Sequence, residues 1–118
     1  MTMRDSSAPS PAAVAGFERV ARATDLPEGT LLSASYGRGR VCLFNHAGQI
    51  GATADLCTHQ AFPMAEGTLA ADGTIECAWH GARFDSRSGE VRQGPADEPL
   101  AVYDVRVQDG DIWVGPRR

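Results

Sequence analysis

From residue 17 onward, short apolar stretches alternate with turn-forming residues. In the first half of the chain, apolar and polar positions follow the two-residue period of half-buried strands. Gly, Pro or Asn residues stand between these stretches, as expected for tight turns. The pattern predicts four strands, of which the last two form a hairpin. They span residues 17–23, 30–36, 41–44 and 50–54.

The second half of the chain continues with shorter segments of the same kind. Asp72-Gly73 and Asp109-Gly110 are strong signals for hairpin turns. No segment of helical length shows the apolar period of a helix. We therefore expect an all-β fold, a sandwich or barrel of about eight to ten short antiparallel strands. The further strands are predicted at residues 68–69, 74–77, 90–92, 101–107 and 112–114.

Composition narrows the class of protein. The length of 118 residues corresponds to one domain, and 42% hydrophobic with 22% charged residues is ordinary for a globular protein. The formal net charge of −4 argues against nucleic acid as a partner, because nucleic-acid binders need a basic surface. The chain has no run of about 18 apolar residues, so we expect no membrane-spanning segment.

The first fifteen residues differ in character from the rest, since Ser, Pro and Ala dominate them. They contain neither the apolar core of a secretory signal nor a twin-arginine pair. We interpret residues 1–15 as a mobile N-terminal tail and residues 16–118 as one domain, and we expect a cytoplasmic location. In that reducing compartment, cysteines near histidines indicate metal binding rather than disulfides. Cys42, within a predicted strand, is expected to be a buried thiol.

Four metal-ligating residues stand in two short pairs. Cys57-Thr58-His59 is followed, after 17 residues, by Cys77-Ala78-Trp79-His80. Each pair has one Cys and one His, and each lies at the loop end of a predicted hairpin. This differs from zinc ribbons and zinc fingers, although a zinc site on the same four residues stays open as an alternative. A two-iron cluster would fit if Cys57 and Cys77 bound one iron and His59 and His80 the other.

The pattern C-x-H-x17-C-x2-H resembles the Rieske iron–sulfur family, and most closely the free Rieske ferredoxins of bacterial aromatic-ring dioxygenase systems. The resemblance implies one [2Fe–2S] cluster on Cys57, His59, Cys77 and His80. It also implies an antiparallel β-sandwich or barrel that carries a small cluster-binding subdomain of two hairpin loops at about residues 55–85. The similarity covers roughly residues 16–118 and continues through Glu66-Gly67, His80-Gly81, Phe84-Asp85, Ser88-Gly89 and Gly94-Pro95.

The function implied by this resemblance is electron transfer. The chain would carry single electrons from an NAD(P)H-dependent flavoprotein reductase to a terminal Rieske non-haem iron oxygenase. It would not itself be an enzyme, because oxygen activation needs a second iron on two histidines and a carboxylate. Only His46 remains beside the two cluster histidines, and we interpret it as a solvated turn residue. The alternative is a Rieske-like small subunit of another redox complex, such as nitrite reductase.

High-potential members of the family carry features that this chain lacks. They have a disulfide between the two loops, at the positions of Ala61 and Trp79 here. They also have a Ser and a Tyr whose hydroxyls bond the cluster, at the positions of Ala82 and Phe84. Because such hydrogen bonds raise the potential, we expect a value at the low end of the Rieske range, on the order of −150 mV.

The resemblance also suggests roles for residues beside the ligands. Gln93-Gly94-Pro95 resembles the third, proline-containing loop of the family, which shields the cluster. From its position between two ligands, Trp79 is a candidate to shield the cluster or to form part of an apolar docking rim. Phe62 and Pro63 are candidates to cover the first loop. Gly67 and Gly81 are expected where the backbone must follow a tight path.

Overall fold

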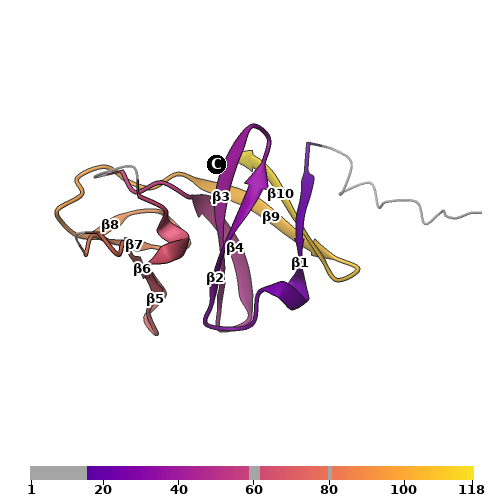
Figure 1. Cartoon of the computed structure of the whole chain (residues 1–118), viewed down its shortest axis with the longest axis horizontal. Coiled ribbons are helices and arrows are strands. Elements are labelled where there is room, and N and C mark those ends of the chain that lie inside the picture. The colour runs from indigo at the N-terminus through magenta and orange to yellow at the C-terminus, as the bar shows by residue number, and fades with distance from the viewer. Residues whose placement is uncertain (1–15, 59–61, 80) are drawn as a thin grey trace, which may run out of the picture.

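The computed structural model describes residues 16–58, 62–79 and 81–118 of the chain. Residues 1–15, which the sequence predicts to be a tail, lie outside the described residues. Two of the four predicted ligands, His59 and His80, lie outside them as well. Figure 1 shows the described part as two β-sheets, a larger one and a smaller one to its left.

The larger sheet has six strands in the order β1-β10-β9-β4-β3-β2, and every neighbouring pair is antiparallel. The smaller sheet has four antiparallel strands in the order β5-β6-β7-β8. The bounds in the larger sheet are β1 Glu18–Arg22, β2 Leu31–Tyr36, β3 Gly39–His46, β4 Gln49–Ala54, β9 Val102–Gln108 and β10 Asp111–Arg117. Those in the smaller sheet are β5 Thr68–Leu69, β6 Thr74–Glu76, β7 Arg83–Asp85 and β8 Val91–Gln93.

The predicted all-β fold is confirmed. The described residues contain ten strands and two short 3₁₀ helices, η1 Ala23–Asp25 and η2 Met64–Glu66. Strand β7 was not predicted from the sequence, and it is defined by its pairing with β6 and β8. Within the described part, no helix has the length and apolar character needed to cross a membrane.

Strand β3 lies between two apolar cores and contributes side chains to both. Val41 and Leu43 point into the interior of the larger sheet, whereas Cys42 and Phe44 point toward the smaller sheet. All four side chains are buried, as alternating faces of a doubly covered strand require. Phe44 stands opposite Gly51 of β4, where an added Cβ would lie 2.3 Å from the Phe44 ring. The absence of a side chain at Gly51 therefore leaves room for this ring.

The larger sheet curls into a nearly closed barrel, and side-chain hydrogen bonds link its ends. The hydroxyl of Tyr36 on β2 donates to the carbonyl oxygen of Gly115 on β10 at 2.7 Å. The N–H of Gly37 donates to the carboxylate of Glu18 on β1 at 2.8 Å. The Tyr36 ring also packs edge-on against Tyr103, with 5.6 Å between centroids. These contacts cover the two edge strands, which would otherwise present unpaired backbone groups.

Replacing Tyr36 with Phe removes the hydroxyl that closes the barrel and keeps the ring. We expect the free energy of unfolding to fall by about 1 kcal/mol at neutral pH, measured by urea denaturation. Burial raises the pKa of Tyr36, with smaller contributions from Tyr103 and Glu18. Because the pKa of Tyr36 is higher in the folded than in the unfolded state, its neutral side chain stabilises the fold at pH values below the unfolded-state pKa. This stabilisation is lost as the pH rises through the folded-state pKa. The difference between wild type and variant should therefore shrink as the pH rises above about 10.

Tyr103→Phe is the matched control, because the Tyr103 hydroxyl has no hydrogen bond to the described residues. It should change stability by less than about 0.5 kcal/mol. Equal losses in the two variants would show that the Tyr36–Gly115 hydrogen bond does not stabilise the closed sheet.

Candidate metal centre

The two predicted ligand loops close in the same way. The N–H of Cys57 donates to the carbonyl oxygen of Phe62 at 3.0 Å, and the N–H of Cys77 donates to that of Ala82 at 2.8 Å. Each cysteine therefore begins a six-residue loop whose base is held by a backbone hydrogen bond from its own amide. The second loop is tightened by a bond from Gly81 N–H to the carbonyl oxygen of Cys77 at 3.0 Å.

Both cysteines are buried at the bases of these loops. Cys57 is 5% exposed and Cys77 is 2% exposed, and both belong to the apolar core between β3 and the smaller sheet. The structure thus brings two of the four predicted ligands into one core. The other buried members of this core are Cys42, Phe44, Met64, Ile75, Ala82, Phe84, Ala96 and Leu100.

Two aromatic side chains join the loops above this core. Phe62, at the end of the first loop, stacks on Trp79 of the second, with ring centroids 5.6 Å apart and planes 25° apart. The structure therefore places these two residues in contact across the two loops. Trp79 and Leu56 are each 53% exposed, which makes them two of the three large apolar side chains that the described part exposes. An apolar surface therefore borders both loops.

The third loop lies against both ligand loops. The hydroxyl of Thr58 donates to the carbonyl oxygen of Glu98 at 2.8 Å. The side-chain amide of Gln93 donates to the carbonyl oxygen of Gly81 at 3.0 Å. The peptide bond between Gly94 and Pro95 is cis. This arrangement agrees with the interpretation of Gln93-Gly94-Pro95 as part of a loop that covers the site.

Asp55 is a supporting residue that the sequence analysis did not identify. Its side chain is buried, and it accepts hydrogen bonds from the Ser33 hydroxyl at 2.8 Å and from the Ala65 N–H at 3.2 Å. Arg40 in turn donates to the Ser33 hydroxyl at 2.7 Å. Asp55 therefore links β2 to the segment that follows the first ligand loop. An acidic residue at the end of an apolar strand, two positions before Cys57, was the available signal.

Gly67 is required by a close approach between backbones. A Cβ at this position would lie 1.8 Å from the carbonyl oxygen of Glu76, the residue before Cys77. The expected tight path at Gly81 has a different cause, since its φ of +78° lies in the left-handed region that favours glycine. Both glycines thus set the position of the second ligand loop, one through contact and one through backbone conformation.

Cys42 and His46 lie outside the candidate centre. Cys42 is fully buried, and burial, together with the charge of Asp55, raises the pKa of its thiol to about 12. It is therefore the inert buried thiol that the sequence predicts. His46 is only partly exposed, and its Nε2 lies 3.0 Å from the carbonyl oxygen of Ala71. Its ring links the end of β3 to the turn before β6, a role beyond that of a solvated turn residue.

The donor set fits an iron–sulfur cluster as far as the described residues reach. Two buried thiols at the bases of adjacent loops can supply thiolates to one metal ion in surroundings from which water is excluded. Outside the segments around His59 and His80, no three His, Cys, Asp or Glu side chains are grouped so that they could hold a metal ion.

Comparison with known proteins gives one consistent family. Residues 16–104 match the family described as Rieske [2Fe-2S] domain. The biphenyl dioxygenase ferredoxin subunit of Pseudomonas sp. (strain KKS102) is 34% identical over 83% of this chain and 90% of that protein. The ferredoxin of carbazole 1,9a-dioxygenase from Nocardioides aromaticivorans IC177 has a similar structure, with a TM-score of 0.80, 30% identity, and coverage of 86% and 99%.

A second solved structure is similar and contains a partner protein. It is described as a complex of reduced oxygenase and oxidized ferredoxin in carbazole 1,9a-dioxygenase. The matching chain has a TM-score of 0.79 and 32% identity, and the match covers 85% of this chain and 93% of that one.

Gly67→Ala should disrupt the candidate centre, because its Cβ would overlap the Glu76 carbonyl and force the two ligand loops apart. We expect a loss of stability of more than about 3 kcal/mol or failure to accumulate folded protein. The iron bound per protein chain, measured after purification, should fall in parallel.

Gly39→Ala provides the comparison, because an added Cβ at this exposed position meets no atom within 4 Å. It should leave both stability and bound iron close to the wild-type values. If Gly67→Ala also retained full iron content and stability, the close approach would have no structural importance.

Proposed function

Since this chain belongs to the Rieske [2Fe–2S] domain family, we propose that it is an electron-transfer ferredoxin with one cluster on Cys57, His59, Cys77 and His80. Cys57 and Cys77 would bind one iron, and His59 and His80 the other. The observation that carries the proposal is the matched pair of loops, each beginning at a buried cysteine and closed by that cysteine's amide. Two histidines at unequal spacing complete the Rieske pattern.

The cluster would supply reversible one-electron chemistry, with a neutral core when oxidised and a single negative charge when reduced. The protein contributes burial and fixed loop geometry. Cys57 and Cys77 lie in an apolar core that excludes water, and the Phe62–Trp79 stack holds the loops together. Ala82 and Phe84 are fully buried and offer no hydroxyl. This favours a low potential, because fewer donors stabilise the reduced state.

The relatives indicate which partners such a carrier would serve. One is named as a ferredoxin subunit of biphenyl dioxygenase, and one similar chain occurs in a complex with an oxygenase. We propose that this chain receives electrons from an NAD(P)H-dependent flavoprotein reductase in the cytoplasm and delivers them to a terminal oxygenase. The first is named as a ferredoxin subunit, and the second title names a ferredoxin beside its oxygenase. Both therefore support a role as carrier to an oxygenase over that of a nitrite reductase subunit.

The reduction potential tests the assignment of a low-potential carrier. We expect a midpoint on the order of −150 mV by voltammetry of the purified protein. Ala82→Ser should raise the midpoint potential, because it adds a hydroxyl near the second loop. Ala71→Ser adds the same group on an exposed turn and should leave the potential unchanged. A wild-type midpoint well above zero would contradict the assignment.

Electron delivery tests the function itself. NADH, a flavoprotein reductase and a terminal oxygenase from the same genome should form hydroxylated product only when this protein is added. His59→Cys and His80→Cys should each change the visible spectrum and reduce product formation at least about 100-fold, because the ligand set fixes the potential. Gly39→Ala should support normal turnover. Product formation without this protein, or unchanged turnover with both histidine variants, would refute the proposal.

A further inference from the structure

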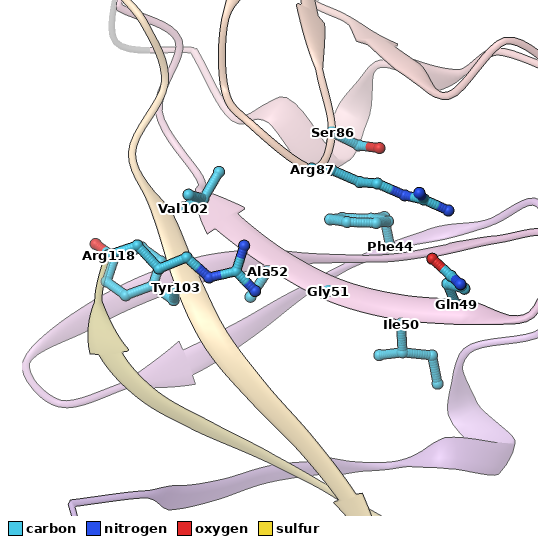
Figure 2. Close-up of a pocket in the computed structure, with 10 residues that line it drawn as sticks. All are labelled: Phe44, Gln49, Ile50, Gly51, Ala52, Ser86, Arg87, Val102, Tyr103 and Arg118. Carbon is cyan, nitrogen blue, oxygen red and sulfur yellow. The ribbon is translucent and has the colours of Figure 1, made fainter.

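A small cavity of about 160 Å³ lies away from the two ligand loops. It is found where β4 and β9 meet the turn between β7 and β8 (Figure 2). Its walls combine apolar side chains with several hydrogen-bond donors. Its lining includes Phe44, Ile50, Ser86, Arg87, Val102 and Arg118.

The charge of the lining is opposite to that of the chain. Two arginines and no acidic residue line the cavity, although the chain has a net charge of −4. Arg118 is paired through its Nε with Asp104 at 2.9 Å. The guanidinium of Arg87 has no ion pair or hydrogen bond to the described residues, and its backbone N–H is fixed by a 2.9 Å bond to Asp85. Asp85 itself is engaged by Arg92 at 3.0 Å.

The hydroxyl of Ser86 is a second, independent sign of a missing partner. Ser86 is 1% exposed, and its Oγ makes no hydrogen bond within the described part of the chain. The backbone N–H of Ser86 donates to the Gly73 carbonyl at 3.0 Å, so the residue is held in place. Buried hydroxyls nearly always have a partner, so the Ser86 hydroxyl retains the capacity to donate one hydrogen bond. Figure 2 shows this hydroxyl and the Arg87 guanidinium on the same side of the Phe44 ring.

We propose that this cavity binds a small organic acid. Its carboxylate would pair with the planar guanidinium of Arg87 and accept a hydrogen bond from Ser86, while its apolar part would lie beside Phe44. The apolar walls formed by Ile50 and Val102 favour an organic acid over a bare inorganic anion. The volume is below the 300–1,000 Å³ usual for drug-sized ligands, so the acid must be small. This site is independent of the proposed electron-transfer function.

Benzoate is a suitable probe, because it joins a carboxylate to a small apolar ring. It should be titrated into the oxidised, cluster-containing protein labelled with nitrogen-15, and amide chemical shifts followed by NMR. We expect saturable changes at Ser86, Arg87 and Gly51. Benzamide, which has nearly the same shape without the charge, should bind at least about tenfold more weakly.

Variants separate the cavity from general surface attraction. Arg87→Gln should weaken benzoate binding about tenfold or more, and Ser86→Ala should weaken it less, about threefold. Arg38→Gln removes a similar charge from the exposed turn between β2 and β3. This variant should bind benzoate with wild-type affinity. The amide spectra of all three variants should show the native fold.

Three results would overturn the proposal. Arg87→Gln could bind benzoate with unchanged affinity, or benzamide could bind as tightly as benzoate. Inorganic phosphate could also bind more tightly than benzoate, which would make the cavity a site for inorganic anions. None of these results depends on electron transfer, so failure here and failure of the proposed function can be told apart.

Discussion

The burial of β3 on both faces is the constraint on which the rest of the structure depends. Val41 and Leu43 pack inside the curled sheet, while Cys42 and Phe44 pack under the two ligand loops. The same strand therefore stabilises the barrel and forms the floor of the candidate metal centre. A domain of this size has little apolar surface to bury. One strand that contributes buried side chains to two cores therefore stabilises both. It also makes the loops part of the fold and not an appendage on its surface.

Several contacts link the described parts of the ligand loops to each other and to the third loop. The amides of Cys57 and Cys77 close their own loops, the Phe62–Trp79 stack joins the two, and the third loop is tied to each of them. Metal centres perform best when the residues behind the ligands fix the ligand geometry.

Much of this could be predicted from the sequence, because short alternating segments and Asp-Gly turns are local signals. The four proposed ligands form a pattern of Cys and His in the sequence, and the structure brings Cys57 and Cys77 into one core. The strand β7 was not evident, since it is defined by its pairing with β6 and β8. The role of Asp55 was hidden, and so was the reason for Gly67, because each depends on a residue outside its own segment, Ser33 and Glu76 respectively. Such contacts are set by tertiary packing, which local patterns do not encode.

The central claim is that two cysteines and two histidines hold one two-iron cluster. Electron paramagnetic resonance of the anaerobically purified protein after reduction with dithionite tests it most directly. We predict a rhombic two-iron signal with the low average g-value of a Rieske centre, and pulsed measurements should show coupling to two histidine nitrogens. A signal without nitrogen coupling would contradict mixed ligation. A colourless protein that contains zinc would contradict the cluster altogether.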